Sequence, residues 1–184
     1  MKNLYHGSIS DFRKIEVSAG KNYKDFGPGF YATSQKQHAE SIARRNLRLY
    51  EDTQRAALIN KIRIPNKTAY RYNLLFDDKD LTGLNVLIFK TADANWLKFV
   101  IINRTHVGKV HNYDIVIGPT ADSLTMSIIE DNKVALINSN FHPDIVARVI
   151  EELKVNNYPK QYYFGTEAAI SKLKFDRIPR EIIH

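Results

Sequence analysis

The stretch Asp25-Phe26-Gly27-Pro28-Gly29-Phe30-Tyr31-Ala32-Thr33 decides how we expect the chain to fold. Its two glycines, with a proline between them, allow a tight turn and a close approach of the backbone to another molecule. The hydrophobic run Phe30–Thr33 predicts a short strand leaving this turn. Ser34 and Gln37 have the spacing of a capping box, so we expect a helix next. Together these elements would hold Tyr31 as an exposed ring in a fixed place.

The rest of the chain predicts a mixture of strands and helices. Further strands are expected at residues 2–6, 57–64, 68–76, 86–89, 113–117, 161–164 and 175–183, and helices at residues 34–50, 93–104, 143–154 and 166–173. These elements do not alternate regularly, which favours an α+β fold with antiparallel sheets over a doubly wound one. No repeat, low-complexity segment or clear boundary interrupts the chain, so residues 1–184 are predicted to form a single domain.

Composition excludes several classes of protein. A hydrophobic content of 43% in 184 residues is enough for a sizeable core. No run of about eighteen apolar residues is present, so no membrane span is expected. The N-terminus has no apolar signal core, and we expect a cytoplasmic protein without a membrane partner. Because cysteine is absent, a thiol nucleophile, a disulfide and a thiolate zinc site are excluded.

Basic residues outnumber acidic ones by 27 to 20. The excess is concentrated in one part of the sequence, at Arg44, Arg45, Arg48, Arg55, Lys61, Arg63, Lys67 and Arg71. A field of this sign favours polyanionic ligands, although a solvated basic face is the commoner case. The pattern allows an anionic partner, with nucleic acid as one candidate, and no nucleic-acid fold signature accompanies it.

The usual enzyme templates fail on this sequence. It has no nucleophile elbow, no phosphate-binding loop and no dinucleotide fingerprint, and its histidines lack metal-ligand spacing, so no metal is expected. His6 differs from the other histidines because it closes an aromatic strand and precedes Gly7 and Ser8. An imidazole, a bare backbone and the Tyr31 ring would suit a flat amide-bearing ring held on a ribose. A buried histidine at a strand end is the alternative interpretation.

Three motifs in order carry a resemblance to a known superfamily. They are Leu4-Tyr5-His6-Gly7-Ser8, then the stretch from Gly27 to Thr33, then Gln161-Tyr162-Tyr163-Phe164. This set resembles the diphtheria-toxin and poly(ADP-ribose) polymerase side of the ADP-ribosyltransferases, which carries a His, Tyr, Glu signature on three strands. Residues 96–104 and 113–122 also resemble an uncharacterised bacterial family placed in that superfamily. The resemblance implies an α+β fold, a split antiparallel β-sandwich with flanking helices, and NAD lying in the cleft between the sheets.

The resemblance also implies roles for single residues, with NAD as co-substrate. The implied catalytic residues are His6, Tyr31 and Gln161, and the implied cofactor-binding residues are His6, Gly7, Ser8, Gly29, Phe30 and Tyr31. His6 would hold the 2′-hydroxyl of the nicotinamide ribose, Gly7 would clamp the carboxamide, and Tyr31 would stack on the nicotinamide ring.

Gln161 departs from the pattern because the superfamily has a glutamate there. Cleavage of the nicotinamide–ribose bond builds positive charge on the sugar, which a carboxylate stabilises better than an amide. Gln161 could still position the 2′-hydroxyl or the acceptor. From the sequence, Gln161→Glu is expected to speed nicotinamide release.

The function that follows is a mono-ADP-ribosyltransferase, a glycosyltransferase that uses NAD to modify a macromolecular acceptor, either protein or nucleic acid. Such a protein would suit an intracellular toxin or defence protein with an antitoxin-like protein partner. Two alternatives stay open: a catalytically silent module that binds NAD or ADP-ribose, and an NAD glycohydrolase.

Overall fold

The computed structural model describes residues 1–17, 21–121, 123–153 and 159–183. In this part of the chain strands and helices are mixed, which confirms the predicted α+β class. The chain divides into two compact units. Unit 1 holds Met1–Ile15, Ala32–Leu81 and Ser171–His184, and unit 2 holds Glu16–Tyr31 and Thr82–Ile170. The single domain stays a prediction.

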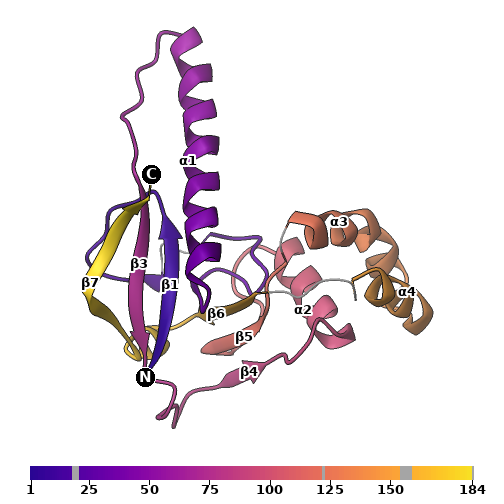
Figure 1. Cartoon of the computed structure of the whole chain (residues 1–184). Coiled ribbons are helices and arrows are strands. Elements are labelled where there is room, and N and C mark those ends of the chain that lie inside the picture. Colours follow the sequence, from indigo (N-terminus) through magenta and orange to yellow (C-terminus); the bar gives the residue numbers. More distant parts are fainter. Residues whose placement is uncertain (18–20, 122, 154–158, 184) are drawn as a thin grey trace. The chain divides into compact units, whose positions relative to one another are not determined.

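Unit 1 is built on an antiparallel sheet. The strands β1 (Lys2–Ser8), β3 (Ala69–Phe76) and β7 (Leu173–Ile183) lie side by side in that order (Figure 1). The end of β2 (Phe30–Thr33) pairs with the other side of β1, through Tyr5 and Thr33. The register of β1 and β3 runs from Lys2 opposite Phe76 to Ser8 opposite Tyr70. The predicted first strand is therefore confirmed, and it extends two residues further than expected.

The two faces of the β1–β3 pair bury different side chains because alternate residues point to opposite sides. On one face the rings of Phe12 and Tyr72 stack with centroids 3.9 Å apart. The other face is covered by the helix α1 (Lys36–Ile59), which buries Ala39 and Ala43 completely. An added Cβ at Gly7 would lie 1.9 Å from the carbonyl oxygen of Ala39, so only glycine allows this close packing.

The helix α1 differs from the prediction at both ends. Its N-cap is Gln35, and no side chain caps it, so the predicted capping box does not form. At the other end α1 continues to Ile59, and the predicted strand at residues 57–64 is absent, since residues 61–68 are neither strand nor helix. The β-branched residues Ile59, Ile62 and Ile64 favoured a strand, but the preceding Ala56, Ala57 and Leu58 are strong helix formers and extend the helix.

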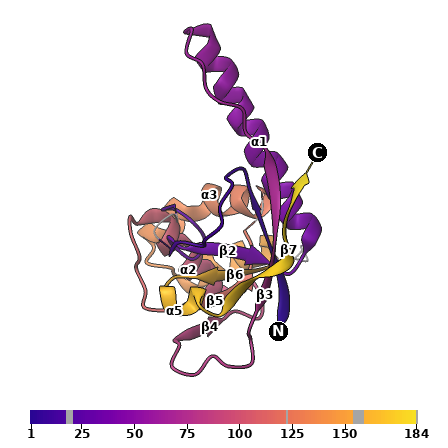
Figure 2. The same ribbon diagram turned by 90° about the vertical axis from the view of Figure 1, so that its left-hand side faces the viewer.

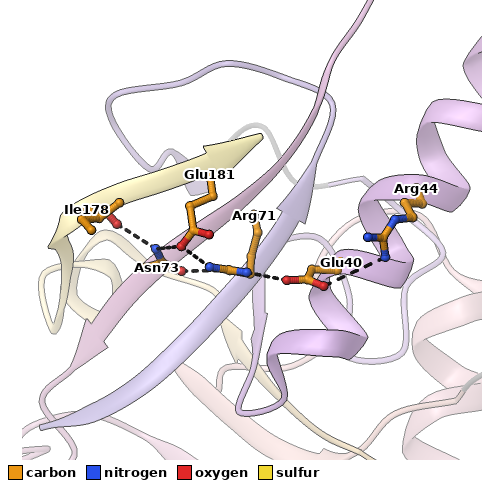
Figure 3. A network of polar contacts seen from close by, with 6 residues as sticks. All are labelled: Glu40, Arg44, Arg71, Asn73, Ile178 and Glu181. Carbon is orange, nitrogen blue, oxygen red and sulfur yellow. Dashed lines mark hydrogen bonds and ion pairs between the residues drawn. The ribbon is translucent and has the colours of Figure 1, made fainter. Parts of the chain in front are cut away.

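A network of polar side chains joins α1, β3 and β7 within unit 1 (Figure 3). Its centre is the guanidinium of Arg71, whose side chain is only 3% exposed. Arg71 donates to the carboxylates of Glu40 and Glu181, and its Nε donates to Asn73 Oδ1 at 3.0 Å. Two carboxylates therefore compensate this buried cation, and Arg71 is unavailable to a polyanion, unlike the exposed arginines of α1.

The strands of unit 2 run in mixed directions. Its strands β4 (Val86–Ile88), β5 (Ile115–Pro119) and β6 (Lys160–Phe164) lie in that order (Figure 2). β5 and β6 are antiparallel, but β4 and β5 are parallel, which departs from the predicted antiparallel sheets. The reason is the helix α2 (Ala94–Thr105), which links β4 to β5 as a crossover.

The helices of unit 2 surround an apolar core. They are α2, α3 (Ser123–Asn138), α4 (Pro143–Leu153) and the short α5 (Glu167–Ile170). The sequence predicted all except α3. Two predicted caps are confirmed, because Asp93 accepts from the Trp96 backbone N–H at 2.9 Å and Thr166 accepts from Ala169 at 3.2 Å. The core includes Phe26, Trp96, Leu97, Val100, Ile101, Val116, Ile129, Leu136, Val149 and Tyr163. Among the described helices of both units, none has the length and apolarity that a membrane crossing requires.

Candidate functional site

A buried carboxylate forms the polar centre of unit 2. Asp25, which directly precedes the glycine turn, is only 4% exposed. Its Oδ1 accepts from Arg104 Nε at 2.7 Å, and its Oδ2 accepts from the Ala121 backbone N–H at 3.0 Å. Gln161 Nε2 also donates to Oδ2, at 2.6 Å. The negative charge is thus balanced by one arginine and by two neutral donors, as a buried carboxylate requires.

The side-chain amide of Gln161 has a defined orientation. Its Nε2 lies 2.6 Å from Asp25 Oδ2 and 3.3 Å from the carbonyl oxygen of Pro119, and both are acceptors. The nitrogen and oxygen of the amide therefore cannot be exchanged without placing two acceptors together. Within the described part of the chain, no group donates to Gln161 Oε1. This oxygen therefore keeps its capacity to accept a hydrogen bond.

Tyr31 belongs to the same part of unit 2, but its ring is partly buried where the sequence predicted an exposed one. Its hydroxyl donates to the carbonyl oxygen of Gly27 at 2.6 Å and accepts from the Phe26 N–H at 3.0 Å. Burial raises the pKa of Tyr31 well above its usual value, and the negative charge of Asp25 raises it further. The ring contacts Tyr163 edge-on, with centroids 5.4 Å apart. The hydroxyl thus fixes the glycine turn and stays protonated.

The two glycines of the turn are required for different structural reasons. Gly27 adopts a φ of +85°, the left-handed conformation that glycine adopts without strain. Gly29 instead allows a close approach, since an added Cβ would lie 2.3 Å from the Tyr163 ring and 2.8 Å from the Phe164 carbonyl oxygen. Phe30 is buried, and its ring lies 6.5 Å from that of Phe164. Both residues bring the start of β2 close to β6, so their side of the turn is packed with protein.

The other predicted site residues lie on β1 in unit 1. The ring of His6 contacts Phe12 edge-on, at 5.8 Å between centroids, and Tyr72 at 6.2 Å. Gly7 faces α1 in a buried position, where a side chain would collide with the helix. Ser8 Oγ accepts from the Ser10 backbone N–H at 3.0 Å and shapes the turn after the strand.

The structure brings two of the three predicted catalytic residues together and leaves the third separate. Tyr31 and Gln161 both lie in unit 2. The charge of Asp25 raises the pKa of Tyr31, and the carboxylate of Asp25 accepts from Gln161 Nε2. His6 lies in unit 1, so the predicted meeting of His6 with the other two stays a prediction. Among the residues that the structure describes, no three acidic or histidine side chains form a group suited to a metal ion.

Sequence reasoning missed Asp25 as the partner of Gln161 and Arg104 as the partner of Asp25. A signal was present in α2, because Arg104 lies four residues after the buried Val100 and eight after the buried Trp96. Residues at this spacing share one face of a helix, so Arg104 falls on the face that was predicted to be core. A cation in that position indicates a carboxylate nearby, and the aspartate before the glycine turn was a candidate.

The fold and this centre define an α+β protein with a buried carboxylate that orients a strand glutamine. Comparison with protein families finds one match, the family described as "Protein of unknown function (DUF3990)", which covers residues 2–175. The chain belongs to this family. Comparison of the chain with curated proteins and with solved structures finds no significant match.

Proposed function

We propose that this protein is a mono-ADP-ribosyltransferase that cleaves NAD and transfers ADP-ribose to a macromolecular acceptor, which is protein or nucleic acid. The sequence motifs support this proposal, since His6, Tyr31 and Gln161 each occupy a separate strand, on β1, β2 and β6. The observation that carries it is the fixed amide of Gln161, with Nε2 bonded to Asp25 and Pro119.

The proposed chemistry depends on Gln161 Oε1, because the bonds to Asp25 and Pro119 use only Nε2. As the bond from ribose to nicotinamide breaks, nicotinamide takes the electron pair and positive charge develops on the sugar. Gln161 Oε1 accepts a hydrogen bond from the 2′-hydroxyl of that ribose and holds the sugar in the reactive position. The Asp25 carboxylate polarises the amide through the hydrogen bond to Nε2, which makes Oε1 a better acceptor.

In this proposal Tyr31 stacks on the nicotinamide ring, as the resemblance implies. His6 holds the 2′-hydroxyl of the ribose, and Gly7 holds the carboxamide through its backbone. The proposed setting is the cytoplasm, where an intracellular toxin or defence protein with an antitoxin-like partner would act. NAD is the co-substrate, and the proposal includes no metal.

A silent binding module is the second candidate, and one observation favours it. The carboxylate of Asp25 already has Arg104, Ala121 and Gln161 as partners, so it stabilises the fold of unit 2 without a substrate. In that case NAD or ADP-ribose would bind without being cleaved.

Incubating the full chain with NAD labelled in its adenylate part distinguishes the candidates. For a transferase we expect free nicotinamide together with label attached to protein or to added nucleic acid. Nicotinamide release with all label in free ADP-ribose would instead indicate a glycohydrolase. NAD binding measured by calorimetry without nicotinamide release would indicate the silent module, and absence of NAD binding would overturn all three.

A further inference from the structure

The distal part of α1 projects away from the sheet of unit 1 (Figure 1). Leu47 is the last α1 residue that packs against the cluster of Ala43, Ala69 and Ile183. Twelve more residues extend α1 by about 18 Å, and the chain then returns beside them. We call residues 48–68 the arm.

The returning stretch is held to the helix mainly by polar contacts. Tyr50 donates from its hydroxyl to the Pro65 carbonyl oxygen at 2.7 Å, and Gln54 Nε2 donates to that of Ile64 at 2.6 Å. Lys67 lies over the ring of Tyr50, with Nζ 5.9 Å from the centroid. The arm therefore has a defined shape without a core of its own.

The end of the arm, residues 58–63, exposes apolar side chains. The exposed fractions are 84% for Ile59, 56% for Leu58 and 56% for Ile62. Lys61 and Arg63 are exposed beside them, and these six residues include no acidic side chain. We call residues 58–63 the tip. An apolar patch bordered by one sign of charge marks an interaction surface.

Lys61 occupies a backbone position in the tip where the left-handed conformation would favour glycine. Lys61 has a φ of +59°, and Ile62 donates its N–H to the Ala57 carbonyl oxygen at 3.0 Å while Lys61 donates to that of Leu58 at 2.9 Å. This pattern is the helix-ending motif in which the left-handed residue is usually glycine. A lysine there is strained, so a structural role alone does not account for its positive charge.

We infer that the tip binds the surface of a lipid bilayer that contains anionic headgroups. Leu58, Ile59 and Ile62 would enter the boundary between headgroups and acyl chains, and Lys61 and Arg63 would contact the headgroups. Nucleic acid fits the tip less well, because phosphates give the three aliphatic side chains no apolar surroundings. This surface contact differs from a membrane span. It departs from the sequence-based expectation of no membrane partner. It does not depend on the proposed NAD chemistry.

The test is co-sedimentation of the full chain with phosphatidylcholine vesicles, with and without phosphatidylserine. We expect binding only when phosphatidylserine is present, and weaker binding as salt rises. Ile59→Ser should weaken binding about tenfold, because it removes the most exposed apolar side chain of the tip. Lys61→Gly should weaken binding about fivefold. The same change should leave the unfolding midpoint equal or higher, because it relieves the left-handed lysine.

Ile178→Ser is the matched control, since Ile178 is another isoleucine of unit 1, 63% exposed, on β7 outside the arm. It should bind like the parent. Equal binding of the parent and Ile59→Ser would overturn the inference, and so would the absence of binding to phosphatidylserine vesicles at low salt. Salt-dependent binding to duplex DNA without vesicle binding would also overturn it and would assign the arm to nucleic acid.

Discussion

Gln161→Glu is expected to destabilise the protein by up to about 4 kcal/mol at neutral pH, because it places a second carboxylate against Asp25. The new oxygen would take the position of Nε2, which lies 2.6 Å from Asp25 Oδ2 and 3.3 Å from the Pro119 carbonyl oxygen. Two carboxylates so close cannot both ionise, so the introduced side chain would keep its proton. Holding a carboxyl with an ordinary pKa of about 4.3 protonated at neutral pH costs roughly 4 kcal/mol.

The loss should depend on pH in a defined direction. The pKa of the new carboxyl is raised in the folded state, so the folded protein binds more protons than the unfolded one above about pH 4.3. The destabilisation therefore grows as pH rises from that value and shrinks as pH falls toward it. Denaturant unfolding of the parent and of Gln161→Glu at several pH values measures it.

The control is the same substitution in an Asp25→Asn background. In this background the carboxyl introduced at position 161 no longer lies against a second carboxylate. Gln161→Glu should therefore destabilise the Asp25→Asn variant less than it destabilises the parent, a difference that a double-mutant cycle detects. Equal effects in both backgrounds would show that Asp25 and Gln161 do not interact. The sequence-based expectation that Gln161→Glu speeds nicotinamide release concerns turnover and stays a separate prediction.

Gln161→Ala should lower nicotinamide release from NAD by about 10²-fold or more while weakening NAD binding less than about tenfold. The large effect on turnover follows from the proposed reaction, in which the amide orients the ribose in the transition state and misplacement of about 1 Å can cost 10²-fold. The small effect on binding follows because a single neutral hydrogen bond contributes about 1 kcal/mol. Turnover at saturating NAD and calorimetric binding measure the two quantities separately.

The matched control for this variant is Lys160→Ala, because Lys160 is the exposed neighbour on the same strand. It should turn over and bind NAD like the parent. A loss of turnover in Gln161→Ala that is accompanied by an equal loss of binding would indicate a folding role for the amide. Unchanged turnover in Gln161→Ala would remove Gln161 from the reaction.

The sequence predicted those elements in which the residue types and the flanking turn residues favour the same secondary structure. β1, β2, β3 and β6 each contain aromatic residues, and all four form close to the predicted places. The end of α1 could not be predicted in this way, because residues 57–64 mix helix formers with isoleucines. The isoleucines at positions 59 and 62 are exposed in the structure, so no burial on a sheet decides the local preference.

The candidate site was predicted residue by residue, but its interactions were not. Gln161 was expected as a neutral substitute for a glutamate, and nothing in its own strand indicates a carboxylate beside it. That carboxylate comes from Asp25, which is 136 positions away in the sequence. Gly7 and Gly29 were assigned to cofactor binding, and the structure adds a packing reason for each, against α1 and against Tyr163. Long-range contacts of this kind depend on the folded arrangement and leave no local pattern.

The central claim is that Gln161 Oε1 faces the nicotinamide ribose, and a crystal structure of the full chain with NAD bound tests it most directly. We predict that the 2′-hydroxyl of that ribose lies within about 3.2 Å of Gln161 Oε1, with Nε2 still donating to Asp25. We also predict that Tyr31 and His6 both contact the nicotinamide riboside. NAD bound away from Gln161, or a Gln161 amide turned away from the sugar with His6 remote from it, would contradict the account.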